Sequence, residues 1–176
     1  MKDLLLYDQY MIVPQLIDPK RATELHTLFE KESVNFGTDD QSPGAPSYYN
    51  FLPFLELLCE KTPVVSQLID ETVLPTYTYA RLYSKGAILN RHKDRPACEI
   101  SLTLNLHSDP VWPIWVKNSK DEEVAVTLQP GDAMLYLGCI AEHWREPFTG
   151  NQCSQVFLHY VRSRGPCAWA YFDKRQ

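Results

Sequence analysis

Two histidines and one aspartate are the residues of this chain whose types and spacing could do chemistry. His92 and Asp94 stand two positions apart, and His143 follows far downstream. Side chains alternate between the two faces of a β-strand, so His92 and Asp94 can reach one ion from one strand end. Two imidazoles and one carboxylate are the ligand set that holds non-haem Fe(II) and leaves coordination positions open. These residues therefore predict one divalent metal bound by His92, Asp94 and His143.

The sequence around the three residues predicts the strands that must position them. Residues 77–83 and 155–161 are strand-like, and residues 99–106 alternate between apolar and polar side chains. Pro130-Gly131-Asp132 is a clear turn signal, and it feeds an apolar stretch ahead of His143. Many short strands joined by turns indicate a sandwich or a jelly-roll barrel.

This arrangement resembles the 2-oxoglutarate and Fe(II)-dependent oxygenases, and among them the prolyl-4-hydroxylase-like group. The resemblance covers about residues 76–160 and rests on the following pattern: Tyr83, Gly86, His92-x-Asp94, Asn105, Pro130-Gly131-Asp132, His143 and a final strand. It implies an α+β protein built on a double-stranded β-helix, or jelly-roll, barrel, with N-terminal helices packed on the outside of one sheet. It also implies Fe(II) as cofactor, 2-oxoglutarate as co-substrate and O2 as oxidant.

The implied reaction is oxidative decarboxylation of 2-oxoglutarate coupled to hydroxylation of a second substrate. A protein prolyl residue, a free amino acid and a small metabolite all remain open as that substrate, so the expected partner is a small molecule or a peptide. A different class also remains open, namely a catalytically inactive jelly-roll barrel that binds a metal or a small molecule. A third hypothesis is a nucleic-acid dealkylating oxygenase, but the formal net charge of −5 argues against nucleic acid as a partner.

The alternation in the predicted strands indicates which side chains face a pocket. In residues 99–106 one face carries Ile100, Leu102, Leu104 and Leu106, and the other carries Glu99, Ser101, Thr103 and Asn105. In the oxygenases the helices cover the apolar face, so the resemblance implies that the polar face lines the pocket. Residues 77–83 place three tyrosines and Arg81 on one face, and we expect that face to line the pocket as well.

The chain departs from the resemblance at the residue that should anchor 2-oxoglutarate. Oxygenases of this group usually place an arginine or lysine near the start of the last strand, but residues 152–157 contain no basic side chain. Arg145, two residues past His143, is the first replacement, because a guanidinium holds a carboxylate through two parallel hydrogen bonds. Arg81 is the second. The expected hydroxyl and amide partners around the anchor are Tyr83, Thr103 and Gln155.

The first 75 residues have mainly helical signals. Asp18-Pro19 predicts a helix start, residues 51–60 predict a second helix, and Thr62-Pro63 predicts the start of a third. Residues 37–49 are rich in Gly, Ser, Pro and Asp and predict a loop. We expect this loop to border the metal pocket and to close over the substrate, although a plain connector is the alternative.

Length and composition limit the remaining possibilities. At 176 residues and 44% hydrophobic content, the chain suits one folded domain, with helical support in residues 1–75 and a jelly-roll core in residues 76–172. The five cysteines include no C-x-x-C pair, which favours reduced thiols and a cytoplasmic location. No apolar run is long enough to span a membrane. The sequence leaves the oligomeric state open.

Overall fold

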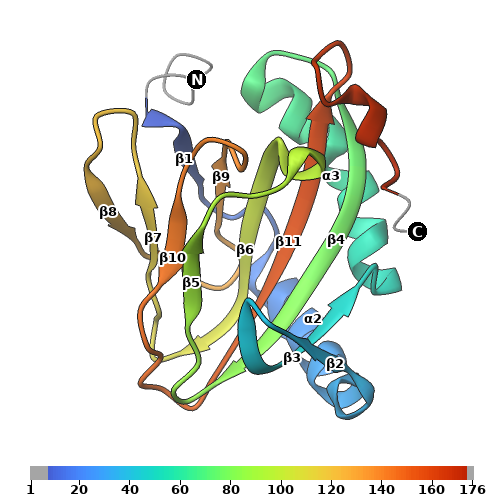
Figure 1. Ribbon diagram of the computed structural model, residues 1–176. Coiled ribbons are helices and arrows are strands. Elements are labelled where there is room, and N and C mark those ends of the chain that lie inside the picture. The colour runs from blue at the N-terminus through green and yellow to red at the C-terminus, as the bar shows by residue number, and fades with distance from the viewer. Residues whose placement is uncertain (1–7, 174–176) are drawn as a thin grey trace.

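Two facing antiparallel sheets form the body of the protein in the computed structural model, which describes residues 8–173 (Figure 1). The larger sheet has the strand order β1-β9-β6-β11-β4-β3-β2 and the smaller sheet the order β5-β10-β7-β8. Neither sheet closes on itself, and the two together make the expected jelly-roll. The strands of the larger sheet, in that order, are Tyr10–Val13, Ala133–Tyr136, Ile100–Asp109, Gln152–Arg162, Val73–Ser84, Ser42–Tyr49 and Gly37–Asp39. Those of the smaller sheet are Leu89–His92, His143–Arg145, Ile114–Lys117 and Glu123–Val126.

Two helices cover the outer face of the larger sheet, as Figure 1 shows. Helix α2 (Pro19–Glu32) begins where expected, because the Asp18 side chain accepts a hydrogen bond from the backbone N–H of Lys20 at 2.8 Å. Short 3-10 turns at Ser33–Asn35, Pro96–Cys98 and Ala168–Ala170 complete the elements. None of the helices within residues 8–173 is long and apolar enough to cross a membrane.

Helix α3 (Leu52–Ile69) corrects the prediction of two separate helices. Pro63 lies inside it and does not end it. A proline leaves the carbonyl four residues earlier, that of Cys59, without its helical partner. Cys59 is exposed, so water can solvate this carbonyl. The apolar face of α3 includes the fully buried Phe54 and Leu57, and its packing on the sheet outweighs the lost hydrogen bond.

The expected division of the strand faces is confirmed. The four apolar side chains of β6 pack in one buried cluster with α2 and α3, together with Val156, Leu158 and Tyr160 of β11. The polar side chains of β6 point the other way, into the space between the sheets, where Thr103 and Asn105 are almost fully buried. Alternation along the strand therefore separates the structural core from the interior of the barrel.

The N-terminal region also supplies strands to the larger sheet. β1 pairs with β9, and β2 and β3 extend the opposite edge beyond β4. The predicted loop at residues 37–49 is therefore wrong as to structure: these residues form the antiparallel β2–β3 hairpin. Ser42 and Ala45 of β3 are buried, because the hairpin packs against the sheet and does not stand in solvent.

Candidate metal centre

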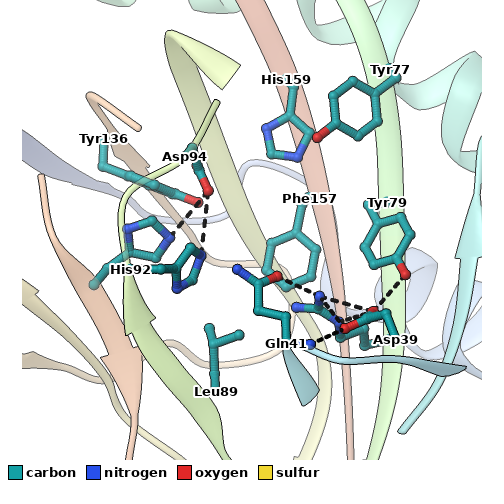
Figure 2. Close-up of a pocket in the computed structure, with 12 residues that line it drawn as sticks. Asp39, Gln41, Tyr77, Tyr79, Leu89, His92, Asp94, Tyr136, Phe157 and His159 are labelled. Carbon is teal, nitrogen blue, oxygen red and sulfur yellow. Dashed lines mark hydrogen bonds and ion pairs between the residues drawn. The ribbon is translucent and has the colours of Figure 1, made fainter. Parts of the chain in front are cut away.

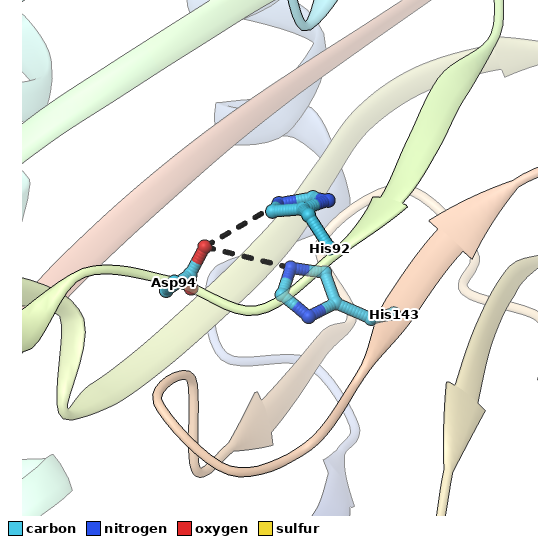
Figure 3. Close-up of side chains that lie close together, drawn as sticks. All are labelled: His92, Asp94 and His143. Atoms are coloured by element: carbon cyan, nitrogen blue, oxygen red, sulfur yellow. Dashed lines mark ion pairs between the residues drawn. The ribbon is translucent and has the colours of Figure 1, made fainter.

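His92, Asp94 and His143 lie together at the end of the smaller sheet, as their spacing predicts (Figure 3). His92 ends β5 and is the cross-strand partner of His143 on β10. The Nε2 atoms of His92 and His143 lie 3.4 Å and 3.6 Å from Oδ1 of Asp94. Ligand atoms in neighbouring positions around a metal, each about 2.1 Å from it, are about 3 Å apart. The three side chains therefore already have nearly the separation that one metal ion requires.

Hydrogen bonds from the far side of each imidazole aim both rings at the same point. Nδ1 of His92 lies 2.7 Å from the carbonyl oxygen of Asn90, and Nδ1 of His143 lies 2.9 Å from that of Ala141. A carbonyl only accepts, so each Nδ1 carries the proton and each Nε2 keeps its lone pair for a metal. Burial lowers the pKa of His143, which favours the neutral imidazole that metal ions bind.

Asp94 is held by backbone and side-chain contacts on the loop after β5. Its N–H donates to the carbonyl of Gly138 at 2.9 Å, and its Oδ2 accepts from the Ser101 hydroxyl at 3.3 Å. A Cβ on Gly138 would lie 2.6 Å from this carboxylate oxygen, so only glycine fits there. Burial alone would raise the pKa of Asp94, but the hydrogen bond from His92 and the charge of His143, when these imidazoles are protonated, bring it below its usual value. The carboxylate is thus ionised and oriented.

The triad opens into a cavity of about 200 Å³ between the two sheets (Figure 2). Tyr77, Tyr79 and Arg81 of the expected pocket face of β4 line this cavity, but Tyr83 does not. The polar side chains of β6, which were also expected to line it, lie in the barrel interior away from the open space. Asp39 and Gln41 come from residues 37–49, which were expected to border the pocket. Leu89 and Tyr136 were missed, because they lie on short strands with no distinctive motif, and Phe157 and His159 of β11 complete the lining.

Arg81 is already paired in this structure. Its guanidinium donates to both carboxylate oxygens of Asp39, at 3.0 and 3.1 Å, and to the side-chain oxygen of Gln41 at 2.6 Å. Burial by itself would lower the pKa of Arg81, but the neighbouring Tyr83 and Asp39 raise it. Both of its acceptor residues come from the β2–β3 hairpin. Arg81 therefore fastens the hairpin to the rim of the cavity.

Arg145 has the opposite environment. Its side chain is fully enclosed behind the cavity lining, and its one hydrogen bond within the described residues runs from Nη1 to the carbonyl of Trp112 at 2.6 Å. Within the part of the chain that the structure describes, Nε and Nη2 of Arg145 and the hydroxyl of Tyr83 are buried without a hydrogen-bond partner. No carboxylate in residues 8–173 pairs with this arginine, and burial lowers its pKa. An unpaired buried cation is costly, so the arrangement is suited to an anionic ligand.

Thr103 and Gln155 lie in the same interior but bond to each other and to the strands. The Thr103 hydroxyl donates to Oε1 of Gln155 at 3.3 Å, and Nε2 of Gln155 donates to Asn105 at 2.8 Å. Neither side chain lines the open cavity. Their expected contact with a co-substrate stays a prediction.

The hairpin that carries Asp39 should loosen when this carboxylate loses its charge. Asp39 accepts hydrogen bonds from Tyr79, Arg81 and the backbone N–H groups of Gln41 and Ser42. We expect Asp39→Asn to speed amide hydrogen exchange in residues 37–42, as measured by mass spectrometry. Asp40→Asn, one residue along and exposed, is the matched control and should leave exchange unchanged.

The same contacts give the hairpin a pH dependence. Burial raises the pKa of Asp39, but Tyr79 and Arg81 outweigh it and bring the pKa below its usual value. An aspartate whose pKa is lower in the folded than in the unfolded protein stabilises the fold at pH values above its unfolded pKa of about 3.9. This stabilisation is lost as the pH falls through the pKa of the folded state. Amide hydrogen exchange in the wild-type hairpin should therefore become faster in acid relative to the rest of the sheet. In Asp39→Asn the hairpin should show no such acid-dependent increase. Equal acid sensitivity in both proteins would contradict the role of Asp39.

Comparison with solved structures shows that this chain shares its fold with Fe(II) and 2-oxoglutarate-dependent oxygenases. A prolyl-4-hydroxylase from Pseudomonas putida superposes with a TM-score of 0.74 and 16% identity, covering 93% of this chain and 97% of that one. The epimerase SnoN of nogalamycin biosynthesis superposes with a TM-score of 0.78 and 11% identity, covering 92% of this chain and 79% of that one. HygX from Streptomyces hygroscopicus, solved with nickel and 2-oxoglutarate, superposes with a TM-score of 0.72 and 11% identity, covering 92% of this chain and 85% of that one. No protein-family profile matches the chain, and no curated protein matches it by sequence.

Proposed function

We propose that this protein is an oxygenase that uses Fe(II), 2-oxoglutarate and O2 to hydroxylate a small-molecule or peptide substrate. The observation that carries the proposal is the triad, whose two Nε2 atoms and one carboxylate oxygen converge beside an open cavity. The fold supports it, because neighbours at 9–16% identity include proteins solved with 2-oxoglutarate bound.

The donor set fits the cofactor. His92, Asp94 and His143 would hold Fe(II), since mixed imidazole and carboxylate ligands suit this ion and leave positions open for other ligands. When bound, the iron, 2-oxoglutarate and O2 supply the oxidising chemistry that yields succinate, CO2 and a hydroxylated product. The protein positions these reactants. Its aromatic side chains Tyr77, Tyr79 and Phe157 line the cavity, and a substrate packed against these rings would displace water from it.

Arg145 and Tyr83 are the groups that fit the distal carboxylate of 2-oxoglutarate. Arg145 lies two residues beyond His143 on β10, about 7 Å along a strand, and it pairs in register with Leu89, which lines the cavity. Its two unpaired N–H groups and the Tyr83 hydroxyl could each donate to a carboxylate. Arg81 is the alternative anchor, but it would first have to release Asp39 and Gln41.

Succinate formation is the direct test of this function. Anaerobically purified protein, reconstituted with Fe(II), should convert 2-oxoglutarate into succinate only when O2 is admitted, at least in the slow turnover that occurs without substrate. His143→Ala, prepared in parallel, is the control and should form none. If the reconstituted wild type binds iron and 2-oxoglutarate yet forms no succinate with any candidate substrate, the non-catalytic binding barrel is the better description.

The hairpin is proposed as the segment that covers the substrate, in the closed position in which Arg81 already holds Asp39 and Gln41. Asp39 and Gln41 line the cavity, so the predicted position of residues 37–49 beside the pocket is confirmed even though their loop structure is not. A closed hairpin would keep water from the reacting groups. Faster exchange of its amides in Asp39→Asn, accompanied by more succinate formed per substrate hydroxylated, is the result expected of such a closure.

A further inference from the structure

The side chain of Gln41 faces the triad across the cavity and has one defined orientation. Its amide has an oxygen that only accepts hydrogen bonds and a nitrogen that only donates them. The partner on one side is Nη2 of Arg81 at 2.6 Å, and a guanidinium has no acceptor. The oxygen must therefore face Arg81, and the –NH2 group must face away from it. Figure 2 shows this nitrogen pointing toward the side of the cavity that holds His92.

The position of this –NH2 group is set before any ligand arrives. The backbone N–H of Gln41 donates to Oδ1 of Asp39 at 2.9 Å, and Asp39 is itself paired with Arg81. Only 5% of the Arg81 side chain is exposed, so this clamp has little freedom to move. Both ends of the Gln41 residue are thus tied to the same ion pair. A donor held in this way loses little conformational entropy on binding.

The –NH2 group of Gln41 has no hydrogen-bond partner among residues 8–173 and borders open space in the cavity. The ion pair beside it is internally neutralised, and the aromatic side chains Tyr77, Tyr79 and Phe157 form part of the remaining wall. A ligand that fits this wall has an apolar body and an oxygen that can accept from Gln41. An ammonium group would meet a donor there and would gain no hydrogen bond from Gln41.

We propose that Gln41 determines the substrate class, by donating a hydrogen bond to a carbonyl or carboxylate oxygen of a small substrate. This inference rests on the proposed function only in taking the cavity beside the triad as the substrate site. At about 200 Å³ the cavity is smaller than the 300–1,000 Å³ typical of drug-sized ligands. The cavity opens to solvent, so it suits the reacting end of a small molecule or one side chain of a peptide, with the rest of the substrate outside. Gln41 acts as a specificity residue and takes no part in bond breaking.

Two probes of the same carbon skeleton test the polarity of this contact. N,N-dimethylpropanamide carries only an acceptor, whereas protonated N,N-dimethylpropylamine carries only a donor. Binding of each probe is measured by ligand-observed NMR on full-length protein loaded with Zn(II) and saturating 2-oxoglutarate, so that no turnover occurs. The wild type should bind the amide more tightly than the ammonium probe.

Gln41→Glu should reverse this preference. One glutamate oxygen would keep the bond to Arg81, and the other would present an acceptor where the wild type presents a donor. The ratio of the two affinities should change by about tenfold or more, since hydrogen bonds to charged groups contribute about 1.5–3 kcal/mol. Gln41→Met, of similar length, should remove the preference without reversing it. Gln129→Glu makes the same change of charge on an exposed residue outside the cavity and should leave the ratio unchanged.

Three outcomes would overturn the inference: a wild type that prefers the ammonium probe, a ratio unchanged in both Gln41 variants, or a wild type that binds neither probe. Each of these is separable from a failure of the proposed function, which would appear as absent succinate formation in the iron-loaded protein.

Discussion

His143→Ala is expected to abolish stoichiometric Fe(II) binding, which is among the largest single effects predicted for this protein. The variant removes one of three ligands from a buried site and leaves Asp94 and His92 alone to hold the ion. His143 is 2% exposed, so the variant also loses the hydrogen bond to the Ala141 carbonyl and the packing of the imidazole against the Tyr136 ring. Anaerobic titration with Fe(II), with metal content measured by mass spectrometry, gives the stoichiometry.

A second group of potential ligands makes this experiment discriminating. Asp94, Cys98 and His159 also have ligand atoms within 4.8 Å of one another. In the structure, however, Cys98 bonds to the Tyr77 hydroxyl at 3.0 Å and His159 bonds to Ser101 at 2.8 Å. Burial raises the pKa of the Cys98 thiol, which opposes the thiolate that a metal needs. His159→Ala should therefore bind iron like the wild type. Loss of iron in His159→Ala with retention in His143→Ala would move the metal to the second group.

Arg145→Met is expected to weaken 2-oxoglutarate binding about tenfold or more while metal binding stays near normal. The variant removes charge-assisted hydrogen bonds, each contributing about 1.5–3 kcal/mol, but removes no metal ligand. Isothermal titration of Zn(II)-loaded protein with 2-oxoglutarate measures the change. Arg81→Met is the matched comparison on β4. A large loss in Arg81→Met with none in Arg145→Met would transfer the anchor to Arg81.

The stability of the ligand-free protein separates an anchor from a structural arginine. Arg145 contacts the carbonyl and the ring of Trp112, but among residues 8–173 it has no carboxylate partner and its Nε and Nη2 are unpaired, so its burial is only partly compensated until an anion binds. Methionine, similar in volume and apolar, should therefore leave the free energy of unfolding of the ligand-free protein unchanged or increase it. Saturating 2-oxoglutarate should stabilise the wild type more than the variant. Marked destabilisation of the ligand-free variant would show that Arg145 holds the fold itself.

The sequence alone determined the parts of this protein that follow from local periodicity. The two-residue repeat of side chains on a strand separated the core face of β6 from its interior face. His92 and Asp94 lie together because they are only two residues apart, at the end of β5 and on the loop that follows it. Helix α2 was predictable because Asp18 and Pro19 act within one turn of the chain. In each case the signal and the structure lie within a few residues of each other.

Only the tertiary structure decided the features that depend on distant partners. Residues 37–49 have a loop composition, yet they form a hairpin because β4 offers an open edge and Arg81 a partner for Asp39, 42 positions away. Pro63 stays inside α3 because the sheet buries the helix on both sides of it. Arg81 and Arg145 look alike in the sequence. The fold places the carboxylate of Asp39 beside Arg81 and leaves Arg145 enclosed without a carboxylate partner among residues 8–173. Whether a buried charge is paired depends on which strands meet around it.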